Sequence, residues 1–304
     1  MEISGSFPKR GEKVIFNDID LFLCPMVSSY PHFYLNKDYV FTLHDMQERY
    51  YPSFFSKRER FVRWLNNKTL AKNSSKIICE SNFVKNDIHK FTGIKEDKIN
   101  IIQTPPPEDF LKVEFLQSSF ASIKKKYNLP TKFIFYPAQC WHHKNHIKLI
   151  EAFNIVSEKR KDIFLVLTGS QKNNYINVVN KIEELKISEK VIHLGYIDYV
   201  DLPYFYKMSQ FLIMPTLFES VSIPIYEAFS LEVPVCSSNV VALPEQVGDA
   251  GLIFDPFDIN DMAEKMILFL DDKNLRAEKG AKGLKRILNF NHDQFKTKLL
   301  KVLN

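Results

Sequence analysis

The chain has 304 residues, of which 45% are apolar and 25% charged; the composition is ordinary for a globular protein and the length predicts about two domains. The formal net charge of +5 suits binding to anionic phosphates or to an anionic membrane surface, but it is too small to indicate a nucleic-acid-binding protein. Only 9 residues are glycine, and neither a G-x-G-x-x-G sequence nor a Walker-type loop occurs, which argues against a nicotinamide dehydrogenase and against a P-loop enzyme.

Cysteine usage and apolar run length indicate the cellular compartment. Cys24, Cys79, Cys140 and Cys236 are far apart and form no C-x-x-C pair, so we interpret them as reduced thiols. No apolar run approaches the roughly 20 residues of a membrane span, and the first residues lack a signal-peptide core. We expect a cytoplasmic protein and leave open a peripheral contact with the inner face of the membrane.

Four short apolar segments in the first half of the chain predict buried strands. They span residues 21–25, 39–43, 76–79 and 98–102. His44 and Asp45 directly follow the second of these strands, where a binding cleft is expected, so we consider both functional candidates. A purely structural histidine is the alternative. The Asp18-Ile19-Asp20 sequence precedes its strand, so we do not expect a metal site there.

Aromatic and basic side chains are mixed in residues 47–65. Apolar residues recur at loosely helical intervals after Pro52, with Arg58, Arg60 and Arg63 between them. One interpretation is an amphipathic helix whose aromatic side lies in the core. The other is a surface that sits among anionic lipid headgroups and meets a lipid-linked acceptor.

A polar, proline-rich break at residues 104–109 predicts a domain boundary. We therefore divide the chain into a domain of residues 1–110, a domain of residues 111–290, and a C-terminal helix, 291–304, that crosses back to the first domain. In the second domain, residues 133–136 and 163–167 predict strands, and a helix is expected through Ile150 and Phe153.

His142 and His146 are four residues apart, as in a zinc-binding helix. The residue after His142 is His143 rather than a glutamate, and Lys144 would repel a cation, so we expect no metal here. Lys144 follows a strand and opens a helix, a position that suits a phosphate ligand.

The stretch Pro215–Phe229 organises the second half of the chain. The apolar run 211–214 predicts a buried strand, and Pro224 suits the first position of a helix because its missing N–H would have no partner there. Glu219 and Glu227 then flank a loop at the sheet edge where ligands bind. Free amides of the loop and helix N-terminus suit a phosphate, and the carboxylates suit neighbouring hydroxyls. The alternative is a surface Glu that compensates the helix dipole.

This stretch resembles the Glu–seven residues–Glu motif of the retaining glycosyltransferases of family 4, also called group 1, which have the GT-B fold. The resemblance covers about residues 18–290 and continues through Pro234-Val235, Leu243-Pro244-Glu245, Gly248-Asp249-Ala250-Gly251 and Asp255-Pro256. It implies an α/β, GT-B-like fold of two Rossmann-type, doubly wound parallel-sheet domains that face a cleft. The family begins with a glycine-bearing strand-to-helix turn, whereas this chain enters at a later strand, which implies a reduced first domain.

The resemblance also implies the site residues. The implied catalytic residues are His44, Asp45 and Glu219. The implied donor-binding residues are Gln139, Lys144, Gly195, Tyr196, Ile197, Ser220, Val221, Ser222, Ile223 and Glu227.

The resemblance gives several of these residues an expected role. Amides of Ser222 and Ile223, with Lys144, are expected to hold a leaving diphosphate. Glu227 is expected to accept ribose hydroxyls, and Glu219 to orient the sugar ring. His44 is expected to lie near the C6 side of the sugar and to help fix an oxocarbenium-like state, and the residues after Gly195 to touch the base.

The chain departs from the family pattern at two places. Gln139 stands where the family has an arginine five residues before the lysine, and Ser220-Val221-Ser222 replaces the usual Gly-x-Gly. Side chains there narrow the approach to a phosphate, although the two hydroxyls add donors.

The resemblance implies retaining transfer of a hexose, with a mannose-like sugar favoured, from a GDP- or UDP-linked donor. The acceptor would be a saccharide or a lipid-linked sugar of cell-surface polysaccharide or lipopolysaccharide synthesis, and neither metal nor cofactor is expected. No second nucleophilic carboxylate is apparent, so front-face attack is favoured over a covalent intermediate. Two alternatives stay open: a non-catalytic sugar-nucleotide-binding partner of another transferase, and a sugar-nucleotide epimerase on the same fold.

Overall fold

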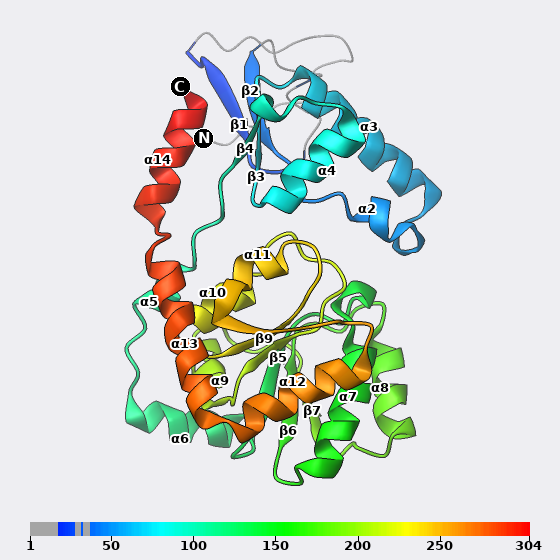
Figure 1. Cartoon of the computed structure of the whole chain (residues 1–304), viewed down its shortest axis with the longest axis vertical. Coiled ribbons are helices and arrows are strands. Elements are labelled where there is room, and N and C mark those ends of the chain that lie inside the picture. The colour runs from blue at the N-terminus through cyan, green and yellow to red at the C-terminus, as the bar shows by residue number, and fades with distance from the viewer. Residues whose placement is uncertain (1–17, 28–31, 33–36) are drawn as a thin grey trace. The chain divides into compact units, whose positions relative to one another are not determined.

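The computed structural model describes residues 18–27, 32 and 37–304. It divides into two compact units, of which the first contains residues up to Thr104 together with Asp293–Asn304, and the second contains Pro105–His292. Each unit is built on one parallel sheet, and Figure 1 labels the elements of both. None of the helices in the described part of the chain combines the length and apolarity that crossing a bilayer requires. The expected α/β class with parallel sheets is confirmed.

The first unit has a four-stranded sheet in the order β1-β2-β3-β4. Its strands are β1 (Leu21–Cys24), β2 (Asp38–Thr42), β3 (Lys76–Cys79) and β4 (Ile99–Ile101). All neighbouring strands are parallel, so their carboxyl ends meet at one edge of the sheet. All four strands lie on the predicted apolar segments.

Helices of the first unit follow the strands and return at the end of the chain. They are α2 (Gln47–Tyr50), α3 (Lys57–Asn73), α4 (Asn82–Thr92), α14 (His292–Leu303) and the 3₁₀ turns η1 (Pro52–Phe54) and η2 (Glu96–Lys98). Ser81 caps the N-terminus of α4, because its hydroxyl accepts a hydrogen bond from the Val84 amide at 3.2 Å. Helix α14 completes this unit: Val302 is buried with Val40 and Ile78, and its carbonyl accepts a 2.6 Å hydrogen bond from Lys76.

The second unit has a six-stranded sheet in the order β10-β9-β8-β5-β6-β7. Its strands are β5 (Phe133–Pro137), β6 (Phe164–Thr168), β7 (Val191–His193), β8 (Leu212–Met214), β9 (Val235–Ser238) and β10 (Gly251–Phe254). The chain adds strands first on one side of β5 and then, from β8 on, on the other side. This is the doubly wound arrangement, and its switch point lies between β5 and β8, where such sheets bind ligands.

Helices connect these strands and bury the sheet. They are α5 (Glu108–Leu111), α6 (Gln117–Lys126), α7 (His146–Lys159), α8 (Tyr175–Glu184), α9 (Leu202–Met208), α10 (Ile223–Ser230), α11 (Leu243–Val247), α12 (Ile259–Asp271), α13 (Lys273–Leu288) and the 3₁₀ turns η3 (His142–Lys144) and η4 (Gly248–Ala250). Helix α7 packs against α8 and α12, and α10 packs against α5 and α13 (Figure 1). The core is rich in fully buried aromatic side chains, including Phe135, Tyr206 and Phe229.

Gly169 lets the ends of β5 and β6 approach closely. Its φ is +125°, and a Cβ added there would lie 2.6 Å from both the carbonyl carbon and the oxygen of Ala138. The neighbouring backbone cannot yield easily, because the Ala138 amide donates to the Thr168 carbonyl at 2.9 Å and the Gly169 amide donates to the Gly195 carbonyl at 2.7 Å. The carboxyl edge of the sheet therefore requires glycine at this position.

We expect Gly169→Ala to lower the free energy of unfolding of the second unit by about 3 kcal/mol, because the added methyl meets fixed backbone in a conformation that side chains rarely adopt. Gly195→Ala is the matched control: its φ is +70° but no atom lies within 4 Å of the added Cβ. It should cost about 1 kcal/mol. Urea denaturation monitored by circular dichroism measures both, and equal losses in the two variants would contradict the steric argument.

Candidate functional site

An ion pair joins the two loops at the switch point of the second sheet. Lys144, the last residue of η3 after β5, donates through Nζ to Oε2 of Glu219 in the loop after β8. Each side chain is 19% exposed, so the pair faces solvent only in part. The structure therefore brings these two predicted residues together at the carboxyl edge of the sheet.

Backbone contacts fix the two loops that carry this pair. Asn145 has a left-handed backbone with φ of +58°, and its Nδ2 donates to the carbonyls of Pro215 and Pro256, at 3.0 Å each. The Leu217 amide donates to the His143 carbonyl at 2.8 Å. The loops after β5 and β8 are thus tied together by the Asn145 side chain and by a main-chain hydrogen bond, independently of the charges on Lys144 and Glu219.

Glu227 is buried below the loop, with 7% of the residue exposed. The Tyr206 hydroxyl donates to Glu227 Oε2 at 2.5 Å. Burial raises the pKa of Glu227, and the Tyr206 hydrogen bond acts in the opposite direction. The surface-residue alternative is therefore wrong for Glu227. Helix α10 begins at Ile223, so Pro224 is at the second helical position rather than the predicted first, and Glu227 lies in the second turn.

The Ser222 amide already has a partner, contrary to expectation. It donates to Gln246 Oε1 at 2.9 Å, and Gln246 Nε2 donates back to the Ser222 carbonyl at 2.7 Å. The Ser222 hydroxyl is buried and, among the described residues, bonds to nothing. Phosphate binding by this amide stays a prediction, and it requires Gln246 to release the amide. Ser220, Val221 and Ile223 are half-buried.

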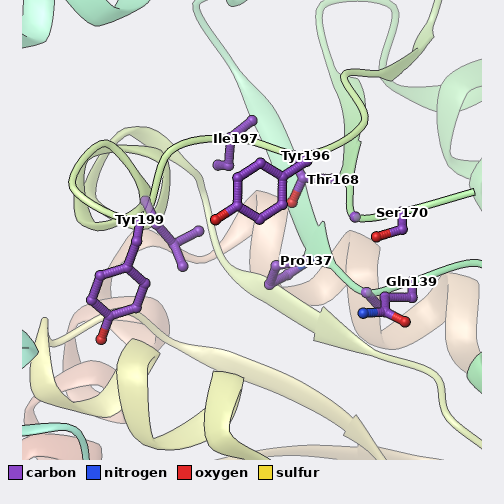
Figure 2. Close-up of a pocket in the computed structure, with 10 residues that line it drawn as sticks. Pro137, Gln139, Thr168, Ser170, Tyr196, Ile197 and Tyr199 are labelled. Atoms are coloured by element: carbon purple, nitrogen blue, oxygen red, sulfur yellow. The ribbon is translucent and has the colours of Figure 1, made fainter.

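A pocket of about 210 Å³ opens at the carboxyl ends of β5, β6 and β7. It is lined by Pro137, Ala138, Gln139, Thr168, Gly169, Ser170, Tyr196, Ile197, Tyr199 and Leu202. Figure 2 shows Gln139 and Ser170 at one end of it and Tyr199 at the other. The predicted residues Gln139, Tyr196 and Ile197 are among the lining residues. Gly195 does not line the pocket, although its carbonyl accepts a hydrogen bond from the Gly169 amide in the neighbouring loop.

Sequence reasoning identified three of the ten lining residues and missed the other seven. Thr168, Gly169 and Ser170 close the predicted strand 163–167, and their place at the carboxyl end of a strand next to β5 was a usable signal. Tyr199 lies just before α9 and Leu202 is the first residue of that helix, and neither position gave such a signal. Two of these residues, Thr168 and Ser170, add hydroxyls to the pocket.

His44 lies in the first unit, after the carboxyl end of β2, and both of its ring nitrogens are bonded. Nδ1 contacts Glu80 Oε1 at 2.5 Å, and Nε2 contacts the Pro25 carbonyl at 2.8 Å. Since both partners are acceptors, the arrangement fits an imidazolium that donates twice. The hydrogen bond to Glu80 is the main cause that raises the pKa of His44 to about 8. At neutral pH the ring is therefore a cation rather than a general base.

Asp45 has contacts of a structural kind. Its Oδ1 accepts from the Gln47 amide at 3.0 Å and from Arg63 Nη2 at 2.7 Å. Arg63 also donates through Nε to the buried Glu48 at 2.8 Å. The carboxylate of Asp45 thus holds α2 against α3. A catalytic role for Asp45 stays a prediction.

Helix α3 exposes much of its apolar surface. Phe61, Val62 and Leu65 are 59%, 45% and 45% exposed, and the buried residues of α3 are Asn67, Leu70 and Ala71. Arg58 lies one turn before Phe61 and is also exposed. The interpretation of an aromatic side buried in the core is therefore wrong for this helix. Its residues form an exposed apolar and basic face instead.

Potential metal ligands are scattered in the described part of the chain. No group of three or more His, Cys, Asp or Glu side chains there is placed to hold a metal ion. The four cysteines are free and buried.

Two family models match the chain. The model described as "Glycosyl transferases group 1" matches residues 119–286, and the model described as "Glycosyltransferase Family 4" matches residues 7–106. The first match covers the switch point, the ion pair and the pocket.

Individual relatives and solved structures agree with these models. The O-antigen chain mannosyltransferase B of Escherichia coli is 27% identical over 277 residues, which are 89% of this chain and 72% of that protein. The serotype-specific mannosyltransferase WbdA of Escherichia coli is 26% identical over 217 residues, 70% of this chain but only 27% of WbdA. The structure of Anabaena HepE in complex with UDP and glucose aligns with a TM-score of 0.79 at 16% identity, over 93% of this chain and 77% of HepE. At this identity the structural match shows the fold.

The His44–Glu80 contact predicts how stability depends on pH. Because the pKa of His44 is raised to about 8 in the folded state, protonation of the ring stabilises the folded protein. This contribution is complete below about pH 6.5, the ordinary histidine value, and is lost as pH rises through about 8. Because the His44 side chain is 45% exposed, solvent screening limits the loss to about 1 kcal/mol.

We expect urea denaturation of the first unit to show this decrease between pH 6 and pH 9 in the wild-type chain and in a His89→Gln control. The decrease should be absent in His44→Gln. A His44→Gln protein that loses as much stability as the wild type over this range would contradict the assignment.

Proposed function

The chain belongs to the group 1 glycosyltransferases, and from this we propose that it transfers a hexose, with mannose favoured, from a nucleoside diphosphate sugar to a saccharide or lipid-linked acceptor in polysaccharide synthesis. The observation that carries the proposal is the Lys144–Glu219 pair at the switch point, beside the pocket on the adjacent strands. The names of two mannosyltransferase relatives support mannose and, for one of them, an O-antigen product.

The ion pair suggests how a donor would bind. In the free protein Lys144 and Glu219 satisfy each other. A sugar diphosphate entering between them would take the ammonium as a phosphate ligand, and the carboxylate would then accept hydroxyl hydrogens of the sugar. Positive charge near the leaving phosphate stabilises the negative charge that develops as the glycosidic bond breaks. Because side chains supply this charge, we propose a reaction without a metal. Retention at the anomeric carbon is proposed from the resemblance to the retaining enzymes of family 4.

Glu227 fits the proposed role of ribose ligand. Its carboxylate is buried, and Tyr206 satisfies Oε2. Burial disfavours the charged form, so further donors are needed to stabilise it, and two vicinal ribose hydroxyls would supply them. The nucleoside would then lie along the pocket that Gln139 and Tyr196 line.

His44 enters the proposal as a binding group. An imidazolium would repel an oxocarbenium-like sugar, so the role of His44 in fixing that state stays a prediction and is not part of this proposal. A cation suits a contact with a sugar hydroxyl or with the departing phosphate, and we propose the sugar's C6 side. Both ring nitrogens have protein partners, so one of these bonds must be shared or exchanged for the contact to form.

Two rival functions stay open, and one of them has a specific observation in its favour. The Gln246 clamp on the Ser222 amide favours a protein that binds a sugar nucleotide without turning it over. An epimerase on the same fold would use the same donor pocket. Incubation with GDP- and UDP-sugars and an acceptor extract separates the three: a glycosylated product supports transfer, a changed sugar without acceptor supports epimerisation, and binding without turnover supports the non-catalytic partner.

We also propose that the exposed face of α3 contacts an anionic membrane, where a lipid-linked acceptor would reside. Phe61 and Leu65 lie one turn apart and are exposed, and Arg58 is on the same helix face. Apolar side chains flanked by bases are typical of helices that lie in the headgroup region. The formal net charge of +5 adds a weak attraction of the same sign.

Substitution of one acidic and one basic residue tests the donor site. We expect Glu227→Ala to weaken nucleoside diphosphate binding about tenfold or more, because hydrogen bonds to a charged group are lost. Lys144→Ala should lower kcat about a hundredfold, because it removes charge that stabilises the leaving group. Isothermal titration and initial rates measure these effects. Glu264→Ala, an exposed residue of α12, is the control. Unchanged kinetics in both site variants would remove the site assignment.

A vesicle experiment tests the membrane face. We expect the double variant Phe61→Ser, Leu65→Ser to cosediment several-fold less than the wild type with vesicles that contain phosphatidylglycerol, since about 25 cal/mol per Å² of apolar burial is lost. Ile176→Ser, which removes an equally exposed apolar side chain from α8, is the matched control and should not change binding. Equal binding by all three proteins, or none by the wild type, would exclude this face as a membrane contact.

A further inference from the structure

The proposed donor carries a diphosphate, and the cations already assigned to it do not balance its charge. The inference below rests on that proposed function. Lys144 is paired with Glu219, so this pair adds no net charge to the site. Gln139, at the end of the pocket next to the loop that carries Lys144, is neutral. A dianionic group bound here requires a further positive charge.

The loop after β6 brings such a charge to the Gln139 end of the pocket. Two backbone hydrogen bonds tie this loop to the loop after β5: the Cys140 amide donates to the Ser170 carbonyl at 3.1 Å, and the Asn174 amide donates to the Cys140 carbonyl at 3.0 Å. The segment between Ser170 and Asn174 contains Lys172. Its position relative to the pocket is therefore fixed by main-chain contacts on both sides.

A tryptophan links Lys172 to the pocket lining. The Trp141 indole N–H donates to Gln139 Oε1 at 3.0 Å, and Lys172 Nζ lies 5.4 Å from the centroid of the Trp141 ring. This arrangement orients the Gln139 amide and places an ammonium over the ring that is bonded to it. Gln139 lines the pocket, so Lys172 is linked to the lining through Trp141.

Lys172 has no acidic partner among the described residues. It is half-buried, and within the described part of the chain no carboxylate lies within ion-pair distance of its Nζ. By contrast, Lys126 contacts both Asp198 and Asp201. A contact with an aromatic ring is weaker than a charge-assisted hydrogen bond to a phosphate oxygen, so the ring can hold the ammonium and still release it.

We propose that Lys172 supplies positive charge to the phosphates of the donor at the Gln139 end of the pocket, and that Trp141 holds it there when the pocket is empty. Gln139 contributes a neutral amide, and the cation comes from the neighbouring loop. The four-carbon stem of the lysine gives the ammonium the reach to move from the ring to a phosphate oxygen. The proposal assigns Lys172 to phosphate affinity and not to recognition of the base.

Isothermal titration of the full chain with nucleoside diphosphates and with the matching nucleosides tests this assignment. We expect the wild type to bind GDP or UDP more tightly than guanosine or uridine. Lys172→Gln should weaken binding of the diphosphate about tenfold and leave the nucleoside unchanged, because one charge-assisted hydrogen bond is lost. Lys172→Arg should stay within about threefold of the wild type.

Lys190→Gln is the matched control. Lys190 also lies over an aromatic ring, 4.5 Å from the centroid of Phe164, but at the amino ends of the strands, opposite the pocket. The Lys190→Gln variant should bind the nucleoside diphosphate like the wild type. If Lys172→Gln binds the diphosphate normally, or loses nucleoside affinity equally, the role of Lys172 is overturned while the donor site stands. If the wild type binds neither GDP nor UDP, the proposed function fails and this inference fails with it.

Discussion

The switch point between β5 and β8 is the constraint on which the second unit depends. The strand order forces the loops after these two strands to diverge toward opposite ends of the sheet, which leaves space between them. Asn145 spans that space by bonding to the carbonyls of Pro215 and Pro256. Lys144 and Glu219 lie on two loops that are held by hydrogen bonds in which neither of the two charged groups takes part. A ligand can therefore separate the two charges while the loops keep their places.

The same unit compensates for its scarcity of glycine with side-chain contacts. Where a glycine-rich loop would offer bare amides, this chain has serines, and Gln246 holds the Ser222 backbone from α11. Glycine is retained at Gly169, where a Cβ would meet the backbone of Ala138. The loop after β8 is thus held by a side chain from α11, and the loop after β6 packs closely against the end of β5, so both loops are held in place without a ligand.

Local pattern was sufficient for most of the fold and for part of the site. Short apolar runs predicted β5, β6 and β8. Strand β9 was missed because its sequence, Val-Cys-Ser-Ser, is half polar, although Ser237 and Ser238 are fully buried. The bonds of Glu227 to Tyr206 and of Ser222 to Gln246 join residues 21 and 24 positions apart, and no single stretch of sequence encodes them. The exposed apolar face of α3 was one of two interpretations, because helical spacing alone does not say which side meets the core.

Helix α14 has a consequence for the order in which the chain acquires structure during synthesis. The second unit, Pro105–His292, is continuous in sequence and can close its core as soon as it has left the ribosome. The first unit cannot, because its sheet is covered by Val302 and its Lys76 bonds to that residue's carbonyl. The first unit can therefore complete its core only after the residues of the second unit have been synthesised, because α14 follows them in the sequence. Until then, the face of β2 and β3 that bears Val40 and Ile78 lacks its cover and is open to chaperones.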